Sequence, residues 1–255
     1  MPELTTDDGL TIVYDEDGVE HRGARPPVIL HHGFVADASV NWHLPGVTAA
    51  LVAAGRHVVA LDARGHGRSS SPHQASYYGE RRMAGDVSLL IDALAVDEAH
   101  LVGYSMGAIV SVIAASADQR IRRLVVGGVG AAVVELGGVD RRVVAPDGLV
   151  AALRANDPST IADPGAAAFR RLADRLGADR LALAAHAEVV NATPIDLAAV
   201  GAACLVIAGR DDPLAARPEV LAAALGQAQV VRVAGDHLGA VADPGFATAI
   251  VTFLA

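Results

Sequence analysis

Residues 103–107 read Gly103-Tyr104-Ser105-Met106-Gly107, and they join a short apolar run to a helical pattern. The run 100–103 predicts a buried strand, and the apolar spacing over 106–117 predicts a helix. Ser105 then lies on a tight turn in which the flanking glycines leave room for the backbone. The helix dipole favours negative charge at this end. A chance G-x-S-x-G is the alternative, and the strand before the motif and the helix after it argue against that.

Outward from this turn, short Val/Ile/Leu runs alternate with amphipathic segments along much of the chain. The runs that predict strands are 28–31, 57–62, 100–103, 124–127, 204–208 and 230–233. Continuous apolar strands between helices predict an α/β fold with a mostly parallel, doubly wound sheet covered on both faces. Near the N-terminus, alternating residues on both sides of Asp8-Gly9 predict an antiparallel hairpin at the sheet edge.

The segment 130–200 interrupts this alternation because it contains helical patterns, at 146–155, 164–176 and 179–190, without a convincing strand. It is too long for a plain loop. We expect a small helical cap over the carboxyl edge of the sheet, where open α/β sheets bind ligands. The predicted organisation is a core of 1–129 and 201–255 with a cap of 130–200.

The composition excludes several kinds of chemistry. All 20 basic residues are arginine, against 29 acidic residues, so the formal net charge is −9. Without lysine there is no Schiff-base lysine, no pyridoxal-phosphate attachment and no P-loop lysine. An acidic chain without a basic run is also a poor partner for nucleic acid. The single cysteine, Cys204, excludes an intramolecular disulfide and a multi-cysteine metal site.

The apolar content is 52% but the aromatic content only 4%, so we expect a core of Ala, Val and Leu. The first ten residues are acidic and polar and do not resemble a signal peptide. The apolar stretches are too short to span a bilayer. We therefore expect a soluble cytoplasmic protein that acts on a small molecule and has no membrane partner. The oligomeric state is left open.

Four further segments, together with the Ser105 turn, span nearly the whole chain and carry a family resemblance. They are His31-His32-Gly33-Phe34, Asp62-Ala63-Arg64-Gly65-His66-Gly67-Arg68-Ser69, Gly209-Arg210-Asp211-Asp212-Pro213 and Gly235-Asp236-His237. The chain resembles the α/β-hydrolase-fold serine hydrolases, in particular the esterase, enol-lactonase and cofactor-free haloperoxidase branch. The order Ser, Asp, His is the order expected of that fold.

The resemblance implies a role for each residue of a catalytic triad. Ser105 is the nucleophile, and His237 takes its proton and returns it to the leaving group. The family spacing assigns the carboxylate to Asp212 rather than Asp211, and we interpret Asp236 as a loop residue. The resemblance also implies an oxyanion hole formed by the backbone N–H groups of Phe34 and Met106. It requires no cofactor and no metal.

Phe34, Trp42 and Met106 are the predicted residues of the substrate pocket. For Trp42, two interpretations are equally good: it lines the entrance, or it packs against the next helix. We interpret His31 and His32 as residues that fix a loop by hydrogen bonds rather than as metal ligands. A structural role is likewise favoured for His186 on a cap helix, with contact to the pocket from above as the alternative.

Together these features predict a serine hydrolase that cleaves a small, largely neutral carboxylic ester or lactone through an acyl-enzyme. A thioester, perhydrolysis and hydrolysis of a C–C bond are alternatives for the same triad. Serine at the nucleophile position argues against the epoxide-hydrolase and dehalogenase branches, which use aspartate there. A non-catalytic ligand receptor on the same fold is disfavoured because the triad is complete. The net negative charge favours a neutral substrate.

Overall fold

The computed structural model describes residues 2–226 and 228–255. Its centre is an eight-stranded sheet with the strand order β1-β2-β4-β3-β5-β6-β7-β8. The strands are β1 (Glu3–Thr5), β2 (Thr11–Asp17), β3 (Val28–His31), β4 (Val58–Leu61), β5 (Ala99–Tyr104), β6 (Ile121–Gly127), β7 (Ala203–Gly209) and β8 (Gln229–Val233). From β4 to β8 every pairing is parallel, and β1 and β2 form an antiparallel hairpin at the edge. The predicted fold class, including the hairpin, is confirmed.

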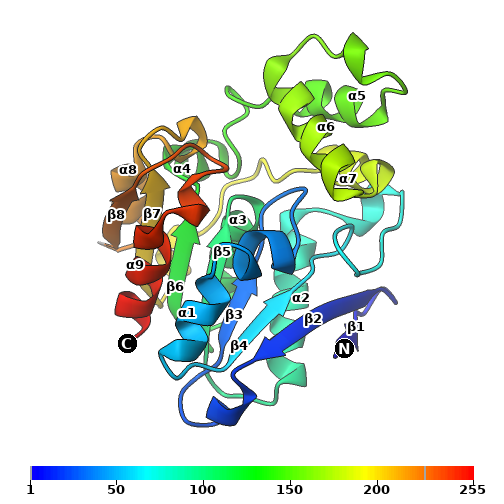
Figure 1. Ribbon diagram of the computed structural model, residues 1–255. Helices are drawn as coiled ribbons and strands as arrows, with labels where there is room; N and C mark the ends of the chain where they lie inside the picture. Colours follow the sequence, from blue (N-terminus) through cyan, green and yellow to red (C-terminus); the bar gives the residue numbers. More distant parts are fainter. Residues whose placement is uncertain (1, 227) are drawn as a thin grey trace.

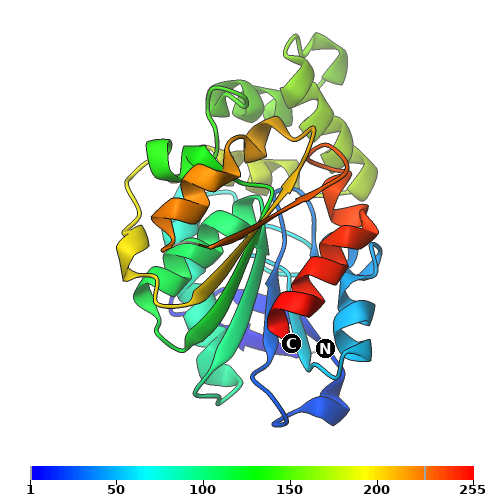
Figure 2. The ribbon, with the colours of Figure 1, turned by 90° about the vertical axis from the view of Figure 1, so that its left-hand side faces the viewer.

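Helices cover both faces of the sheet (Figures 1 and 2). One face is covered by α2 (Glu80–Ala93), α3 (Met106–Ala117) and α8 (Pro218–Ala224), and the other by α1 (Val47–Ala53) and α9 (Pro244–Leu254). The central strands are buried along their whole length because side chains on both of their faces pack against helices. Within residues 2–226 and 228–255, no helix is long and apolar enough to cross a membrane.

Three helices form a layer over one edge of the sheet, at the top of Figure 1. They are α5 (Pro146–Arg154), α6 (Pro164–Leu176) and α7 (Arg180–Ala187). Asp163 and Asp179 cap the N-termini of α6 and α7 by accepting backbone N–H bonds. Leucine and alanine side chains of these helices form a small apolar core of their own, which also buries Val35.

The ends of the segment 130–200 belong to the body of the molecule rather than to this layer. Helix α4 (Ala131–Leu136) packs against α8, and the short turn Leu197–Ala199 packs against α3. The three cap helices coincide with the helical patterns predicted at 146–155, 164–176 and 179–190. Their position over the carboxyl ends of the parallel strands places them above the residues discussed below.

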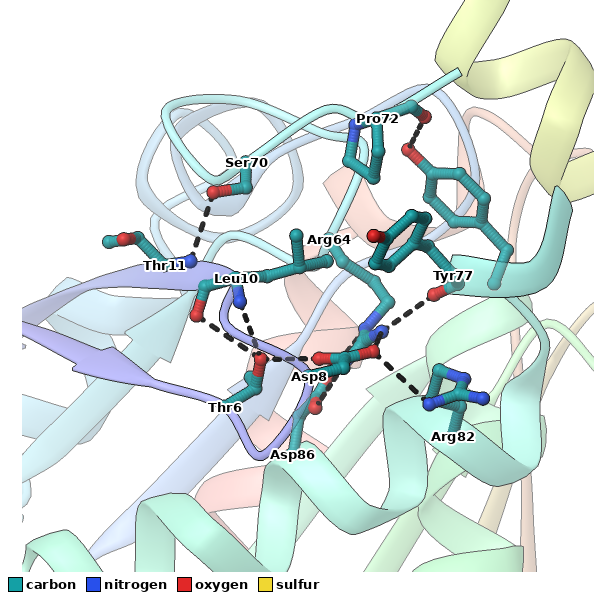
Figure 3. A network of polar contacts seen from close by, with 11 residues as sticks. Thr6, Asp8, Leu10, Thr11, Arg64, Ser70, Pro72, Tyr77, Arg82 and Asp86 are labelled. Carbon is teal, nitrogen blue, oxygen red and sulfur yellow. Dashed lines mark hydrogen bonds and ion pairs between the residues drawn. The ribbon is translucent and has the colours of Figure 1, made fainter. Parts of the chain in front are cut away.

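A buried arginine joins four segments beneath the cap (Figure 3). Arg64 is only 1% exposed. Its guanidinium donates to both carboxylate oxygens of Asp86 on α2, at 2.7 and 2.6 Å, and to Asp8 in the hairpin turn at 2.8 Å. It also donates to the carbonyl oxygen of Tyr77 at 2.6 Å. The turn after β4 is thereby fixed to the hairpin, to α2 and to the segment before α2.

Removing Asp86 should destabilise the fold strongly, because the substitution leaves most of a buried guanidinium without its partner. We expect Asp86→Ala to lower the free energy of unfolding by about 3 kcal/mol. The control is Asp92→Ala, which removes the 59%-exposed partner of Arg120 from the same helix and should cost less than about 1 kcal/mol. Urea unfolding of both variants checks the expectation. If Asp86→Ala and Asp92→Ala lose the same free energy of unfolding, the bonds between Arg64 and Asp86 stabilise the fold no more than an exposed ion pair does.

Candidate active site

The backbone at Ser105 is strained. Ser105 has φ 53° and ψ −115°, a conformation that a non-glycine residue adopts only when its surroundings enforce it. A β-carbon at Gly107 would collide with the carbonyl oxygens of His31 and His32, and one at Gly103 would collide with Gly107. The two glycines are therefore required sterically, and the turn holds the serine at the carboxyl end of β5.

The structure brings the three predicted triad residues into one hydrogen-bonded line. Nε2 of His237 lies 2.9 Å from Oγ of Ser105, and Nδ1 of His237 lies 2.8 Å from Oδ2 of Asp212. The other carboxylate oxygen of Asp212 accepts the N–H of Leu214 at 2.9 Å. The side chain of Asp212 is fully buried, and that of His237 is 14% exposed.

These contacts define the protonation pattern of the imidazole. A carboxylate accepts only, so Nδ1 of His237 carries the hydrogen and Nε2 presents its lone pair to the serine hydroxyl. Asp211 is exposed, and Asp236 accepts the N–H groups of Leu238 and Gly239 within its own loop. Asp212 is thus the only one of the three candidate carboxylates that contacts His237 by a hydrogen bond in the described chain.

The loop after β3 lies beside Ser105. A β-carbon at Gly33 would be 3.4 Å from Cβ of Ser105. His32 fixes this loop, because its Nδ1 donates to the carbonyl of Gly33 at 2.8 Å and its Nε2 accepts the N–H of Ala63 at 2.9 Å. The loop-fixing interpretation of His32 matches these bonds. Met106 is the first residue of α3, so its N–H has no acceptor within the helix.

Two residues that the sequence patterns did not single out also hold the site. Oδ1 of Asn41 accepts the N–H of Gly33 at 2.9 Å and so holds the His32–Gly33 peptide, one residue before the N–H of Phe34. The hydroxyl of Tyr104 donates to the carbonyl oxygen of His237 at 2.6 Å, which joins the loop of the histidine to the serine turn. Tyr104 is a variable position of G-x-S-x-G, and nothing in the sequence around Asn41 indicates its contact.

A cavity opens from Ser105 toward the cap. Its volume is about 560 Å³ when the space at its open mouth is included. Phe34 and Met106 line it, as predicted. The remaining lining residues come from the core and the cap: Glu80, Ser105, Ile109, Val139, Val144, Pro146, Leu149, Phe169, His186, Ala187, Val190 and Leu214.

Trp42 is not part of this cavity, so its place in the predicted pocket is wrong. The indole is fully buried in the apolar core between the sheet and α1, where it packs among residues such as Leu30 and Leu51. It lies on a π-helical turn, Ser39–His43, whose geometry directs this side chain inward. The second interpretation of Trp42, packing against the next helix, is the correct one.

Four buried histidines lie close together under the cap: His31, His32, His66 and His186. Their rings contact one another in pairs with centroid distances of 5.1 to 5.9 Å. Burial lowers the pKa of His31 and His66 to about 4 and that of His186 to about 3, and it holds the pKa of His32 well below its ordinary range. All four rings are therefore neutral at pH 7.

Acid should unfold the protein steeply because these histidines must stay neutral in the folded state. Unfolded histidines have a pKa of about 6.5, so below that pH the unfolded chain binds more protons than the folded one. Stability is then complete above pH 6.5 and falls as the pH drops toward 4. Each histidine contributes a slope of up to about 1.4 kcal/mol per pH unit.

Urea unfolding between pH 8 and pH 5 measures this slope. In His186→Phe the slope of unfolding free energy against pH below pH 6 should fall by up to about 1.4 kcal/mol per pH unit, the contribution of one histidine. A free energy of unfolding that stays constant from pH 7 to pH 5 would contradict the assignment of neutral buried rings.

The chain is similar to known proteins in sequence and in fold. A model of the α/β hydrolase fold matches residues 26–134. An epoxide hydrolase from Caballeronia sordidicola is 42% identical over 90 residues, which is 35% of this chain. That match covers 26% of the relative, so the chain spans only about a quarter of its length.

Two solved structures match over nearly their whole length. A hydrolase from Pseudomonas aeruginosa PA01 superposes with a TM-score of 0.80 at 31% identity, covering 100% of this chain and 98% of that one. The enol-lactonase from Burkholderia xenovorans LB400 superposes with a TM-score of 0.81 at 25% identity, covering 99% of both chains. With this sheet, these motifs and a relative matched from end to end, the chain belongs to the α/β-hydrolase fold family.

Proposed function

We propose that the protein hydrolyses a small, largely neutral carboxylic ester or lactone through an acyl-enzyme on Ser105. The observation that carries this proposal is the hydrogen-bonded line of Ser105, His237 and Asp212 at the bottom of an apolar cavity. The hydrolases among the structural relatives support the class of reaction. The acidic net charge and the absence of an arginine among the described cavity residues support an uncharged substrate.

The geometry fits acyl transfer in two steps. Oγ of Ser105 attacks the ester carbon while its proton moves to Nε2 of His237, and the resulting imidazolium is stabilised by Asp212. The N–H groups of Phe34 and Met106 stabilise the oxyanion. His237 then protonates the departing alkoxide. In the second step His237 activates a water molecule, which attacks the acyl-enzyme and releases the carboxylic acid and the free serine.

The chemistry of a serine nucleophile favours esters over epoxides. Attack of Oγ on an epoxide would form an alkyl ether on Ser105. Water attacks the carbonyl carbon of an ester, but an ether has no such carbon, and the enzyme would stay alkylated after one turnover. The similarity to an epoxide hydrolase over part of the chain therefore supports the shared fold more than a shared reaction.

Loss of the serine hydroxyl should abolish turnover. We expect Ser105→Ala to lower kcat by about 10⁴-fold or more on p-nitrophenyl esters. The control is Ser116→Ala on the same helix, whose hydroxyl bonds only to the carbonyl of Ile113 and whose loss should change kcat less than twofold. A series of esters of increasing acyl length, with lactones and peroxide-dependent reactions in parallel, identifies the preferred substrate. Undiminished hydrolysis by Ser105→Ala would overturn the proposal.

Asn41 should affect kcat more than KM, because it positions the oxyanion loop without lining the cavity. Asn41→Ala frees the N–H of Gly33, and the loop then holds the N–H of Phe34 less firmly. We expect kcat to fall about tenfold, less than the loss of a whole oxyanion donor. Thr48→Ala, a buried polar residue of α1, serves as the control and should keep kcat within twofold. A fall in thermal stability with unchanged kcat would leave Asn41 a structural residue only.

A further inference from the structure

The cavity above Ser105 has two polar residues that acyl transfer does not use. Among its described lining residues, only Ser105, Glu80 and His186 are polar, and every other side chain is apolar. Glu80 begins α2 in the core, and His186 lies on α7 in the cap. In a mostly apolar pocket, a few placed polar groups usually determine how the ligand is oriented.

His186 is held firmly but without a hydrogen bond. Its ring stacks on Tyr78 with a centroid distance of 5.7 Å and an interplanar angle of 11°, and its edge contacts the ring of Phe34 at 5.5 Å. The residue is 1% exposed, and neither ring nitrogen has a hydrogen-bond partner in the described part of the chain. A buried polar group without a partner destabilises the folded protein, and this imidazole has a donor and an acceptor to offer a ligand.

Glu80 restricts the charge of that ligand. The residue is 2% exposed, and its Oε2 accepts the N–H of Asn191 at 2.6 Å. Burial raises the pKa of its carboxyl group. A substrate anion would lie near this acidic group, and no arginine among the described lining residues compensates it. The neutral ring of His186 likewise offers no positive charge. The cavity therefore disfavours an anionic substituent.

We propose that His186 is the polar group of a substrate subsite, in the cavity that Glu80 also lines, that binds an uncharged oxygen substituent, a hydroxyl or a carbonyl group. The apolar part of the substrate lies against the apolar residues that line the cavity between His186 and Ser105. A hydroxyl group can donate to the unprotonated ring nitrogen or accept from the protonated one, and a ketone oxygen can accept from the protonated one. The inference deepens the proposed function and rests on it, because Ser105 holds the ester carbon.

Matched esters test this subsite. The acyl series consists of ethyl hexanoate and its 3-oxo, 4-oxo, 5-oxo and 6-hydroxy derivatives. The alcohol series consists of hexyl acetate and the corresponding oxo- and hydroxyhexyl acetates. Monoethyl adipate and ethyl 6-aminohexanoate add a negative and a positive charge. The measured quantity is the ratio of kcat/KM for each derivative to that of its unsubstituted parent, determined by pH-stat.

We expect at least one oxygenated ester in one series to exceed its parent by about tenfold, the gain from one hydrogen bond in a buried site. His186→Phe should bring this ratio to about one, and His186→Gln, which keeps a donor and an acceptor, should restore part of it. The control Phe169→Leu reshapes the same cavity without a polar change. It should alter the rates of all esters together and leave the ratio unchanged.

The failure of the subsite can be distinguished from the failure of the proposed function. Labelling of Ser105 by a fluorophosphonate and turnover of the parent esters test the nucleophile alone. Calorimetric binding of ethyl 5-oxohexanoate and ethyl hexanoate to Ser105→Ala tests the subsite without turnover. A ratio near one in both series, a ratio that His186→Phe does not change, or a preference for either charged ester would overturn the inference.

Discussion

The candidate site depends on one backbone constraint, the left-handed conformation of Ser105. Such a conformation costs a non-glycine residue of order 1–3 kcal/mol and persists only where the surroundings enforce it. Here the first turn of α3 packs so closely on the end of β3 that Gly107 touches the carbonyl oxygens of His31 and His32. The same contact brings the loop after β3 beside Ser105. The strain at the serine and the placement of the loop therefore have a common cause.

The strand order explains how residues far apart in the sequence meet at this turn. In a parallel sheet all carboxyl ends lie at one edge, so Asp212 after β7 and His237 after β8 reach the end of β5. The hydroxyl of Tyr104 adds a bond from the end of β5 to the carbonyl of His237. The buried Arg64 network supports the opposite side of the site, because the same segment that Arg64 binds at Tyr77 continues into Tyr78, the ring that stacks on His186.

The sequence predicts the features that local patterns encode, and it fails where tertiary contacts decide. The sheet, the hairpin at Asp8-Gly9 and the turn of Ser105 follow from periodicity and from glycines at short, fixed spacings in the sequence. Trp42 could not be assigned, because a single π-helical turn decides whether its indole enters the core or the cavity. Asn41 was missed for a similar reason, since its partner lies eight residues earlier on a different element. The predicted helical patterns 146–155, 164–176 and 179–190 coincide with α5, α6 and α7, whereas nothing in the sequence reveals that the separate helix 131–136 packs on α8.

His186 is a polar side chain at a position where the surrounding residues favour an apolar one. It occupies a buried position of a cap helix among leucine and alanine, where an aromatic hydrocarbon ring would stack on Tyr78 equally well and leave no polar atom without a partner. Violations of local consistency tend to occur where function requires them. The cap therefore contributes more than the exclusion of water. It brings to a mostly apolar cavity a polar group whose cost to the folded protein is offset only when a ligand supplies the missing hydrogen bonds.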